Sequence, residues 1–131
     1  MLEIVPVSNK EFRRHICSDL KTDFIPDSLA YCAKSDGNVL ALCQFKISGD
    51  SADILSFGAA ENDMHVHGHT ARILILAVLN FLDAREVKAV LYHADSTFIK
   101  DLKGFRALEN GSYYTEINGF FSKKAGTKPI K

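Results

Sequence analysis

The segment Ala71–Ala84 constrains the fold most, because almost every residue in it is apolar. Three polar residues, Arg72, Asn80 and Asp83, would form only a narrow stripe along a helix. A helix that is apolar on most sides must be covered by other parts of the chain to be stable in water. The sequence therefore predicts a long helix packed closely against a second layer of structure.

Two β-strand patterns flank this helix. Ala52–Ala60 precedes it, and the β-branched and aromatic segment Val87–Tyr92 follows after only two residues. A helix that joins two strands in this way returns the chain to the same sheet, so we expect these two strands to pair in parallel. The loop Met64–Thr70 leads into the helix. The start of such a helix presents backbone N–H groups and a positive dipole end, which favour an anionic ligand.

The remaining segments predict an α/β (α+β) fold with a mixed, mostly antiparallel sheet of about 6–7 strands flanked by helices. Ser8 and Glu11 have the spacing of a capping box at the start of a helix. The expected further strands are Leu2–Val7, Ser28–Lys34, Val39–Ile47 and a hairpin of Tyr113–Ile117 with Gly119–Lys123, and the further helices are Ser8–Leu20 and Asp95–Lys103.

Length and composition indicate one domain. The chain has 131 residues, and we expect residues 1–123 to form the domain and residues 124–131 to be a frayed tail. The 16 basic residues balance the 16 acidic residues, so no overall charge favours nucleic acid or a membrane surface. The three cysteines form no spaced metal-binding pair, and no signal-peptide pattern follows Met1. These features predict a cytoplasmic protein with reduced thiols.

The order of elements resembles that of the GNAT superfamily of acyl-CoA-dependent N-acetyltransferases. The resemblance rests on the segment His67–Arg72 before the apolar helix, and on Gly104-Phe105-Arg106 further along. It implies a direct transfer of an acetyl group from acetyl-CoA, as substrate, to an amine, with no metal. It also implies that the cofactor contacts the strand end and the loop before the helix, at Phe57, Gly58, Ala59, His67, Gly68, His69, Thr70, Ala71 and Arg72.

Catalytic groups are less well marked by the pattern. The resemblance places Lys100 where many relatives have a tyrosine that protonates the leaving thiolate. Glu61, after the fourth strand, and His93, at the end of the fifth, are the two candidates for a base or an acid. Thr70 and Arg72 stand where the family pattern has glycines. The alternative hypothesis is therefore a catalytically degenerate GNAT-like module that binds acyl-CoA or another protein.

His65, His67 and His69 allow two other interpretations. In a strand the first and last would lie roughly 13 Å apart, whereas two nitrogens on one zinc ion lie at most about 4.2 Å apart. We therefore expect no metal at this cluster. The three also resemble the histidine-triad pattern of nucleotide hydrolases and transferases, whose middle histidine attacks a phosphate. A histidine-triad-like nucleotide hydrolase or transferase is accordingly the third hypothesis.

The sequence does not identify the acceptor. Only Lys21–Asp27 separates the first helix from the second strand, where many relatives of this family insert a helix that shapes the amine site. We expect a small-molecule or peptide amine and no nucleic acid or membrane partner. The pairs Tyr113-Tyr114 and Phe120-Phe121 are expected to pack within the final hairpin or to form a contact in a homodimer.

Overall fold

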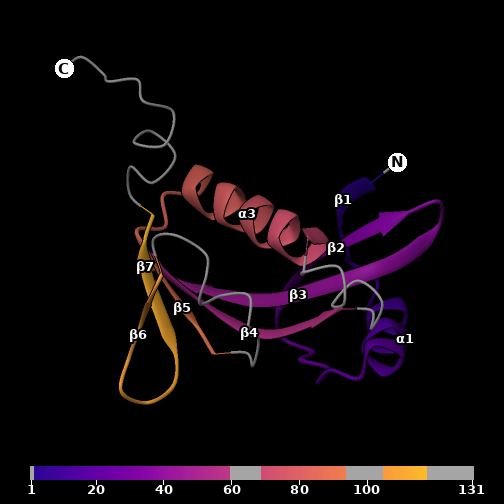
Figure 1. The fold of residues 1–131 in the computed structure, drawn as a ribbon, viewed down its shortest axis with the longest axis horizontal. Helices are drawn as coiled ribbons and strands as arrows, with labels where there is room; N and C mark the ends of the chain where they lie inside the picture. Colours follow the sequence, from indigo (N-terminus) through magenta and orange to yellow (C-terminus); the bar gives the residue numbers. More distant parts are fainter. Residues whose placement is uncertain (1, 60–68, 94–104, 118–131) are drawn as a thin grey trace.

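In the computed structural model, residues 2–59, 69–93 and 105–117 are described, and they form a seven-stranded sheet with a helix on each face (Figure 1). The strand order is β1-β2-β3-β4-β5-β7-β6. All neighbouring strands are antiparallel except β4 and β5, which are parallel as expected. The elements are β1 Leu2–Pro6, α1 Lys10–Leu20, β2 Leu29–Ser35, β3 Asn38–Ser48, β4 Ser51–Ala59, α3 His69–Ala84, β5 Ala89–Tyr92, β6 Arg106–Ala107 and β7 Tyr113–Glu116.

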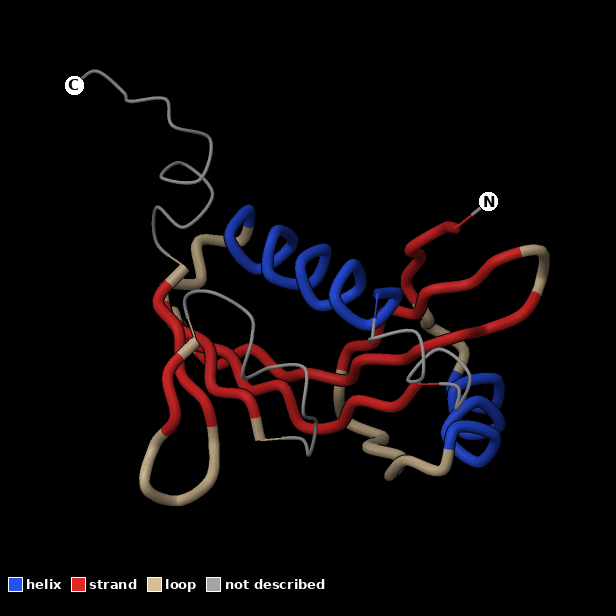
Figure 2. The backbone as a smooth tube through the Cα atoms, in the orientation of Figure 1, coloured by secondary structure: helices blue, strands red, loops and turns tan. Residues whose placement is uncertain are grey.

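The two helices cover opposite faces of the sheet, as the tube in Figure 2 shows. Neighbouring residues of a strand point to opposite faces, and β3 follows this rule. Ala41 and Cys43 belong to the apolar cluster beneath α3, whereas Leu42 belongs to a smaller cluster beneath α1. The apolar run of β3 is therefore explained by burial on both faces.

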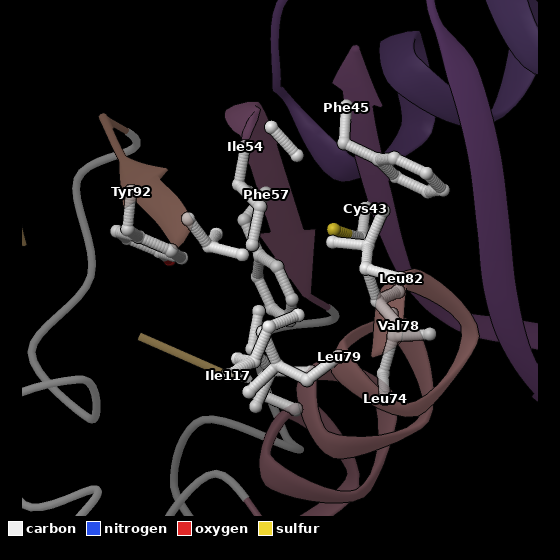
Figure 3. Packing of buried hydrophobic residues seen from close by; sticks show 14 of the residues in the cluster. Cys43, Phe45, Ile54, Phe57, Leu74, Val78, Leu79, Leu82, Tyr92 and Ile117 are labelled. Carbon is white, nitrogen blue, oxygen red and sulfur yellow. The ribbon is translucent and has the colours of Figure 1, made fainter. Parts of the chain in front are cut away.

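Helix α3 supplies one side of the larger core, which Figure 3 shows from close by. Its residues Leu74, Val78, Leu79 and Leu82 are fully buried and pack toward the sheet. The next stripe of apolar residues, including Phe81, is only half-buried. The expected cover on most sides is therefore complete on the face toward the sheet and partial elsewhere.

The first helix differs from its prediction at its start. The N-terminal cap is Asn9, whose side-chain oxygen accepts a hydrogen bond from the backbone N–H of Phe12 at 2.8 Å. The predicted capping box of Ser8 with Glu11 is therefore wrong, because asparagine caps a helix equally well and lies one residue nearer the first turn. Lys21, at φ 57°, ends the helix in the left-handed conformation.

The C-terminal strands also differ from their prediction. β7 pairs with β5 on one edge and with the two-residue strand β6 on the other. The strand β6 was not expected, since two exposed residues carry no alternating pattern. The predicted partner Gly119–Lys123 and the predicted helix Asp95–Lys103 lie outside the described residues. No helix in the described ranges is long and apolar enough to cross a bilayer.

Candidate functional site

Strands β4 and β5 part from one another halfway along β4. β4 pairs with β3 as far as Ala59, but its pairing with β5 runs only from Ser51 to Ile54. The last contact is the hydrogen bond from the His93 N–H to the Ile54 carbonyl, at 2.9 Å. At the same place the register with β3 shifts, which leaves Leu55 as one extra residue in β4. A bulge of this kind bends its strand and re-aims the residues that follow.

The direction of the amides beyond the bulge follows from the hairpin that joins β3 to β4. Ser48 and Ser51 close a two-residue turn, so every second residue of β3 from Ser48 toward Leu42 directs its backbone groups to β4. Phe57 and Ala59 lie opposite Cys43 and Ala41, the residues of β3 whose backbone groups point away from β4. Their N–H groups therefore face away from β3, toward the side where β5 has ended.

The N-terminus of α3 lies toward the same end of the sheet. The Lys88 N–H donates to the Asp50 carbonyl at 2.7 Å, which holds the chain just after α3 beside the start of β4. The 16-residue helix is about 24 Å long, so its first turn lies toward the far end of β4 (Figure 1). That turn contains Thr70 and Ala71, which are buried, and Arg72, which is half-buried.

Several predicted site residues lie outside the described residues. These are Glu61, His65, His67, Gly68 and Lys100. His69 is the first residue of α3, two residues before the predicted start of the helix. Within the described ranges, no group of three or more His, Cys, Asp or Glu side chains could hold a metal ion.

His93, the other predicted catalytic residue, lies where the two strands part and is hydrogen-bonded through both ring nitrogens. Its Nε2 lies 2.9 Å from Oδ1 of Asp53, and its Nδ1 lies 3.0 Å from Oγ of Ser112. The side chains of His93 and Asp53 are 36% and 35% exposed. Sequence reasoning missed Asp53 and Ser112. The parallel register, in which Asp53 lies opposite Leu91, could have indicated the first of them.

The loop between α1 and β2 is held against the outer half of β4, Ser56–Ala59, on the face opposite α3. Gln44 accepts a hydrogen bond from the Ile25 N–H at 3.0 Å and donates to the Asp23 carbonyl at 2.6 Å. The Ser56 hydroxyl also donates to the Asp23 carbonyl and lies 2.8 Å from the Thr22 hydroxyl. Buried polar groups in hydrogen bonds of this kind hold a short loop in one position.

Gly58 allows the same loop to approach β4 closely. A Cβ atom built on Gly58 would lie 2.9 Å from the Cβ and Cγ2 atoms of Thr22. Any larger residue would therefore push the loop away from β4. Gly58 was predicted to contact the cofactor through its backbone. By the alternation described above, Gly58 lies opposite Leu42 and its own N–H faces β3. The reason for glycine that the structure shows is the contact with Thr22 on one face of the strand.

The three cysteines do not form a nucleophilic site. All are buried and free, and Cys43 lies in β3 within the core. Burial raises the pKa of the Cys43 thiol, which keeps it protonated. Burial also raises the pKa of Cys17 and Cys32. Since the thiolate is the reactive form, these residues behave as small apolar side chains.

Comparisons with known proteins identify the fold. Ribosomal-protein-S18-alanine N-acetyltransferase from Escherichia coli matches 89% of this chain with 94% of its own, at TM-score 0.68 and 13% identity. An acetyltransferase of the GNAT family from Staphylococcus aureus aligns over 89% of this chain and 99% of its own, at TM-score 0.66 and 10% identity. N-acetylglutamate synthase from Neisseria gonorrhoeae, complexed with coenzyme A and N-acetyl-glutamate, aligns over 88% of this chain and 35% of its own, at TM-score 0.68 and 10% identity.

No protein-family model and no curated protein sequence matches the chain. At these identities the likeness to the solved structures is one of fold. The mixed sheet, with one parallel pair between β4 and β5 and a helix on each face, is the fold of the GNAT N-acetyltransferases.

Proposed function

We propose that this chain, which has the GNAT fold, is an acetyl-CoA-dependent N-acetyltransferase that transfers the acetyl group directly to an amine. The observation that carries the proposal is the parting of β4 from β5 at the Leu55 bulge. Beyond it, the N–H groups of Phe57 and Ala59 face the side that β5 has left. An extended chain with amide groups, such as pantetheine, can add to a strand edge in this manner.

The first turn of α3 is proposed to bind the pyrophosphate of the cofactor. His69, Thr70, Ala71 and Arg72 belong to that turn, and His67 and Gly68 are proposed to extend the site from the preceding loop. The N-terminus of a helix stabilises an anion by roughly 0.3–2 kcal/mol, and an arginine–phosphate hydrogen bond adds a charge-assisted contact. The half-buried Arg72 supports this assignment, because it stands at the helix end that attracts anions.

The chemistry needs three groups besides the cofactor. The amine must lose a proton as it attacks, the thioester carbonyl must be polarised by an N–H donor, and the departing sulfur must be protonated. We assign the polarising donor to the backbone near Phe57, and we retain His93 and Glu61 as the candidates for proton transfer, each as base or acid. The acceptor is proposed to be a small-molecule or peptide amine.

A binding experiment followed by a transfer assay tests this function. Acetyl-CoA at 100 times its Kd should raise the free energy of unfolding by about 2.7 kcal/mol, measured as a thermal shift. Release of free thiol in the presence of an amine panel then reports transfer. Arg72→Glu should weaken acetyl-CoA binding about tenfold, which corresponds to about 1.4 kcal/mol. Arg14→Glu, at an exposed position on α1, serves as the matched charge reversal and should not change the affinity.

The other outcomes of this experiment identify the alternatives. A thermal shift with acetyl-CoA but no thiol release with any amine would favour the degenerate binding module, which Thr70 and Arg72 at the pattern glycine positions support. A shift with an adenine nucleotide alone would favour the histidine-triad hypothesis. No shift with acetyl-CoA would contradict the proposed function.

A further inference from the structure

Asp53, His93 and Ser112 form a hydrogen-bonded row at the point where β4 and β5 part. They come from β4, from the residue after β5 and from the residue before β7. Ser112 is buried, and its backbone is fixed by two hydrogen bonds, from its N–H to Asn110 Oδ1 at 3.0 Å and from the Leu108 N–H to its carbonyl at 2.8 Å. A base held between a carboxylate and a hydroxyl is the arrangement that activates a hydroxyl for proton transfer.

The hydrogen bonds determine which ring nitrogen of His93 carries the proton. An ionised carboxylate only accepts hydrogen bonds, so Asp53 requires a proton on Nε2. In the neutral imidazole the other nitrogen is then an acceptor, and Nδ1 receives the hydrogen of the Ser112 hydroxyl. The row therefore has one direction, with the Ser112 hydroxyl pointing to His93 and the His93 N–H pointing to Asp53.

The row lies on the sheet face opposite α3. Tyr92 is buried in the core beneath α3, so the next residue, His93, points to the other face. Ser56 and Gly58 of β4 meet the Lys21–Asp27 loop on that same face. The last β4–β5 contact, between Ile54 and His93, brings His93 to the inner end of the opening in which the thioester is proposed to lie, and Ser112 adjoins His93 on the β7 side.

We propose that Ser112 and His93 form a proton relay that removes the proton of the acceptor amine, with Asp53 as a positioning residue. The proposal rests on the proposed acetyl transfer and extends it, since it brings the amine to the face opposite α3. The neutral amine nitrogen attacks the thioester carbonyl carbon, and the carbon–sulfur bond breaks. The amine proton passes to Ser112 Oγ while the Ser112 proton moves to His93 Nδ1. The imidazolium then returns a proton through Ser112 to the departing thiolate.

His93→Gln tests the relay against a purely structural role. Glutamine places an N–H donor near the position of Nε2 and can keep the contact with Asp53, but it cannot accept a proton. We expect kcat to fall about 10²–10⁴-fold, with the thermal midpoint and the KM for acetyl-CoA nearly unchanged. Added imidazole should restore part of the kcat of His93→Gly.

His15→Gln is the matched control. His15 also lies near a carboxylate, with its Nε2 3.4 Å from Oδ2 of Asp19, but on the exposed surface of α1. The same substitution there should leave kcat unchanged. A wild-type protein that transfers no acetyl group overturns the proposed function and the relay with it. An active wild type whose His93→Gln variant keeps its kcat overturns the relay alone.

Variants of Ser112 separate a relay from a covalent nucleophile. Ser112→Ala should lower kcat, and Ser112→Thr should recover part of that loss, because it keeps a hydroxyl. Intact-protein mass spectrometry during turnover should show no acetylated Ser112. An acetyl group found on Ser112 would overturn the relay, since the serine would then be attacking the thioester itself.

The tautomer of His93 gives a readout that does not depend on activity. Nitrogen-15 NMR of the free protein should show a protonated Nε2 and an unprotonated Nδ1. Asp53→Asn should alter this pattern, because an amide can also donate to Nε2. A proton on Nδ1 in the wild type would overturn the relay, since Nδ1 could not then accept from Ser112.

Discussion

The two halves of β4 lie in one strand but in different surroundings. The inner half, Ser51–Ile54, is paired on both edges, with β3 and with β5. The outer half, Ser56–Ala59, keeps β3 on one edge, while its pairing with β5 has ended. Both halves contribute to the core beneath α3, through Ile54 and Phe57 (Figure 3).

The difference shows how a sheet can hold a binding edge without losing its core. Side-chain burial continues along the whole strand, whereas the backbone pairing on the β5 side ends at the Leu55 bulge. A strand edge beyond such a point can receive an extended ligand, and the paired half keeps that edge in position. The inner half should therefore govern stability, and the outer half ligand binding.

The largest expected effect is on the inner half. Ile54→Ala should lower the free energy of unfolding by about 2–5 kcal/mol, because it leaves a cavity in a fully buried site. Leu55→Ala, at the half-buried bulge, is the control and should cost less. Urea denaturation measures both. An equal or larger loss at Leu55 would break the comparison, because the bulge would then carry core stability.

Two proline substitutions compare the backbone of the halves directly. The carbonyls of Asp50 and Ile54 accept hydrogen bonds from the β5 side. Since every second residue of β4 faces that side, the Ala52 N–H also points to β5 and donates to an acceptor there. Ala52→Pro should therefore cost about 1–3 kcal/mol through the acceptor that it leaves without a partner.

Ala59→Pro, at the end of the outer half, should have a smaller effect on stability. It should weaken acetyl-CoA binding by the contribution of one hydrogen bond, about 0.5–1.5 kcal/mol. Denaturation and ligand titration measure the two quantities. Unchanged acetyl-CoA affinity in Ala59→Pro would remove this residue from the proposed pantetheine contact.

The contact between the outer half and the α1–β2 loop can be tested at Gly58. Gly58→Ala should destabilise the fold by about 1–3 kcal/mol, because the added methyl group meets Thr22. Thr22→Ser removes the crowding Cγ2 but keeps the hydroxyl near Ser56, so the double variant should be more stable than the sum of the single variants predicts. Additive losses would show that Cγ2 of Thr22 is not the atom that restricts this position, because the Cβ of residue 22, also 2.9 Å away, remains in the double variant.

The smallest effect is expected at Cys43, which lies opposite Phe57 on β3. Burial raises its pKa, so at pH 8 the thiol stays protonated and should not react with iodoacetamide in the native protein. Alkylation should appear only after denaturation, as measured by mass spectrometry. Rapid labelling of native Cys43 would mean that the outer half opens on the face beneath α3.

Much of the fold could be predicted from local patterns. The apolar periodicity of α3, the two strands beside it and their parallel pairing were all recovered within about two residues. The strand β6 was missed, because Arg106–Ala107 is too short and too exposed to show a pattern. The start of α1 was placed wrongly, because Ser8 and Asn9 are both good helix caps and the choice depends on the backbone conformation.

The candidate site could be predicted only in part. His93 was nominated because it lies at the end of the fifth strand, and Phe57 to Ala59 because the family resemblance implies a cofactor contact at the end of the fourth. Asp53 and Ser112 lie 40 and 19 residues from His93 in sequence, so no local pattern connects them with it.

Hydrophobic periodicity along the chain was therefore enough to predict α1, α3 and the main strands, because burial of a face is encoded by residues close in sequence. The GNAT resemblance rested on the order of the elements and on the segments His67–Arg72 and Gly104-Phe105-Arg106. The parting of β4 from β5, the approach of Thr22 to Gly58 and the row from Asp53 to Ser112 depend on strand register and on contacts between distant segments. A one-residue change of register in β4, for example, would move the side chain of Asp53 to the other face of the sheet. Such geometry is specified by packing of the whole sheet, which is why it appears only in the folded molecule.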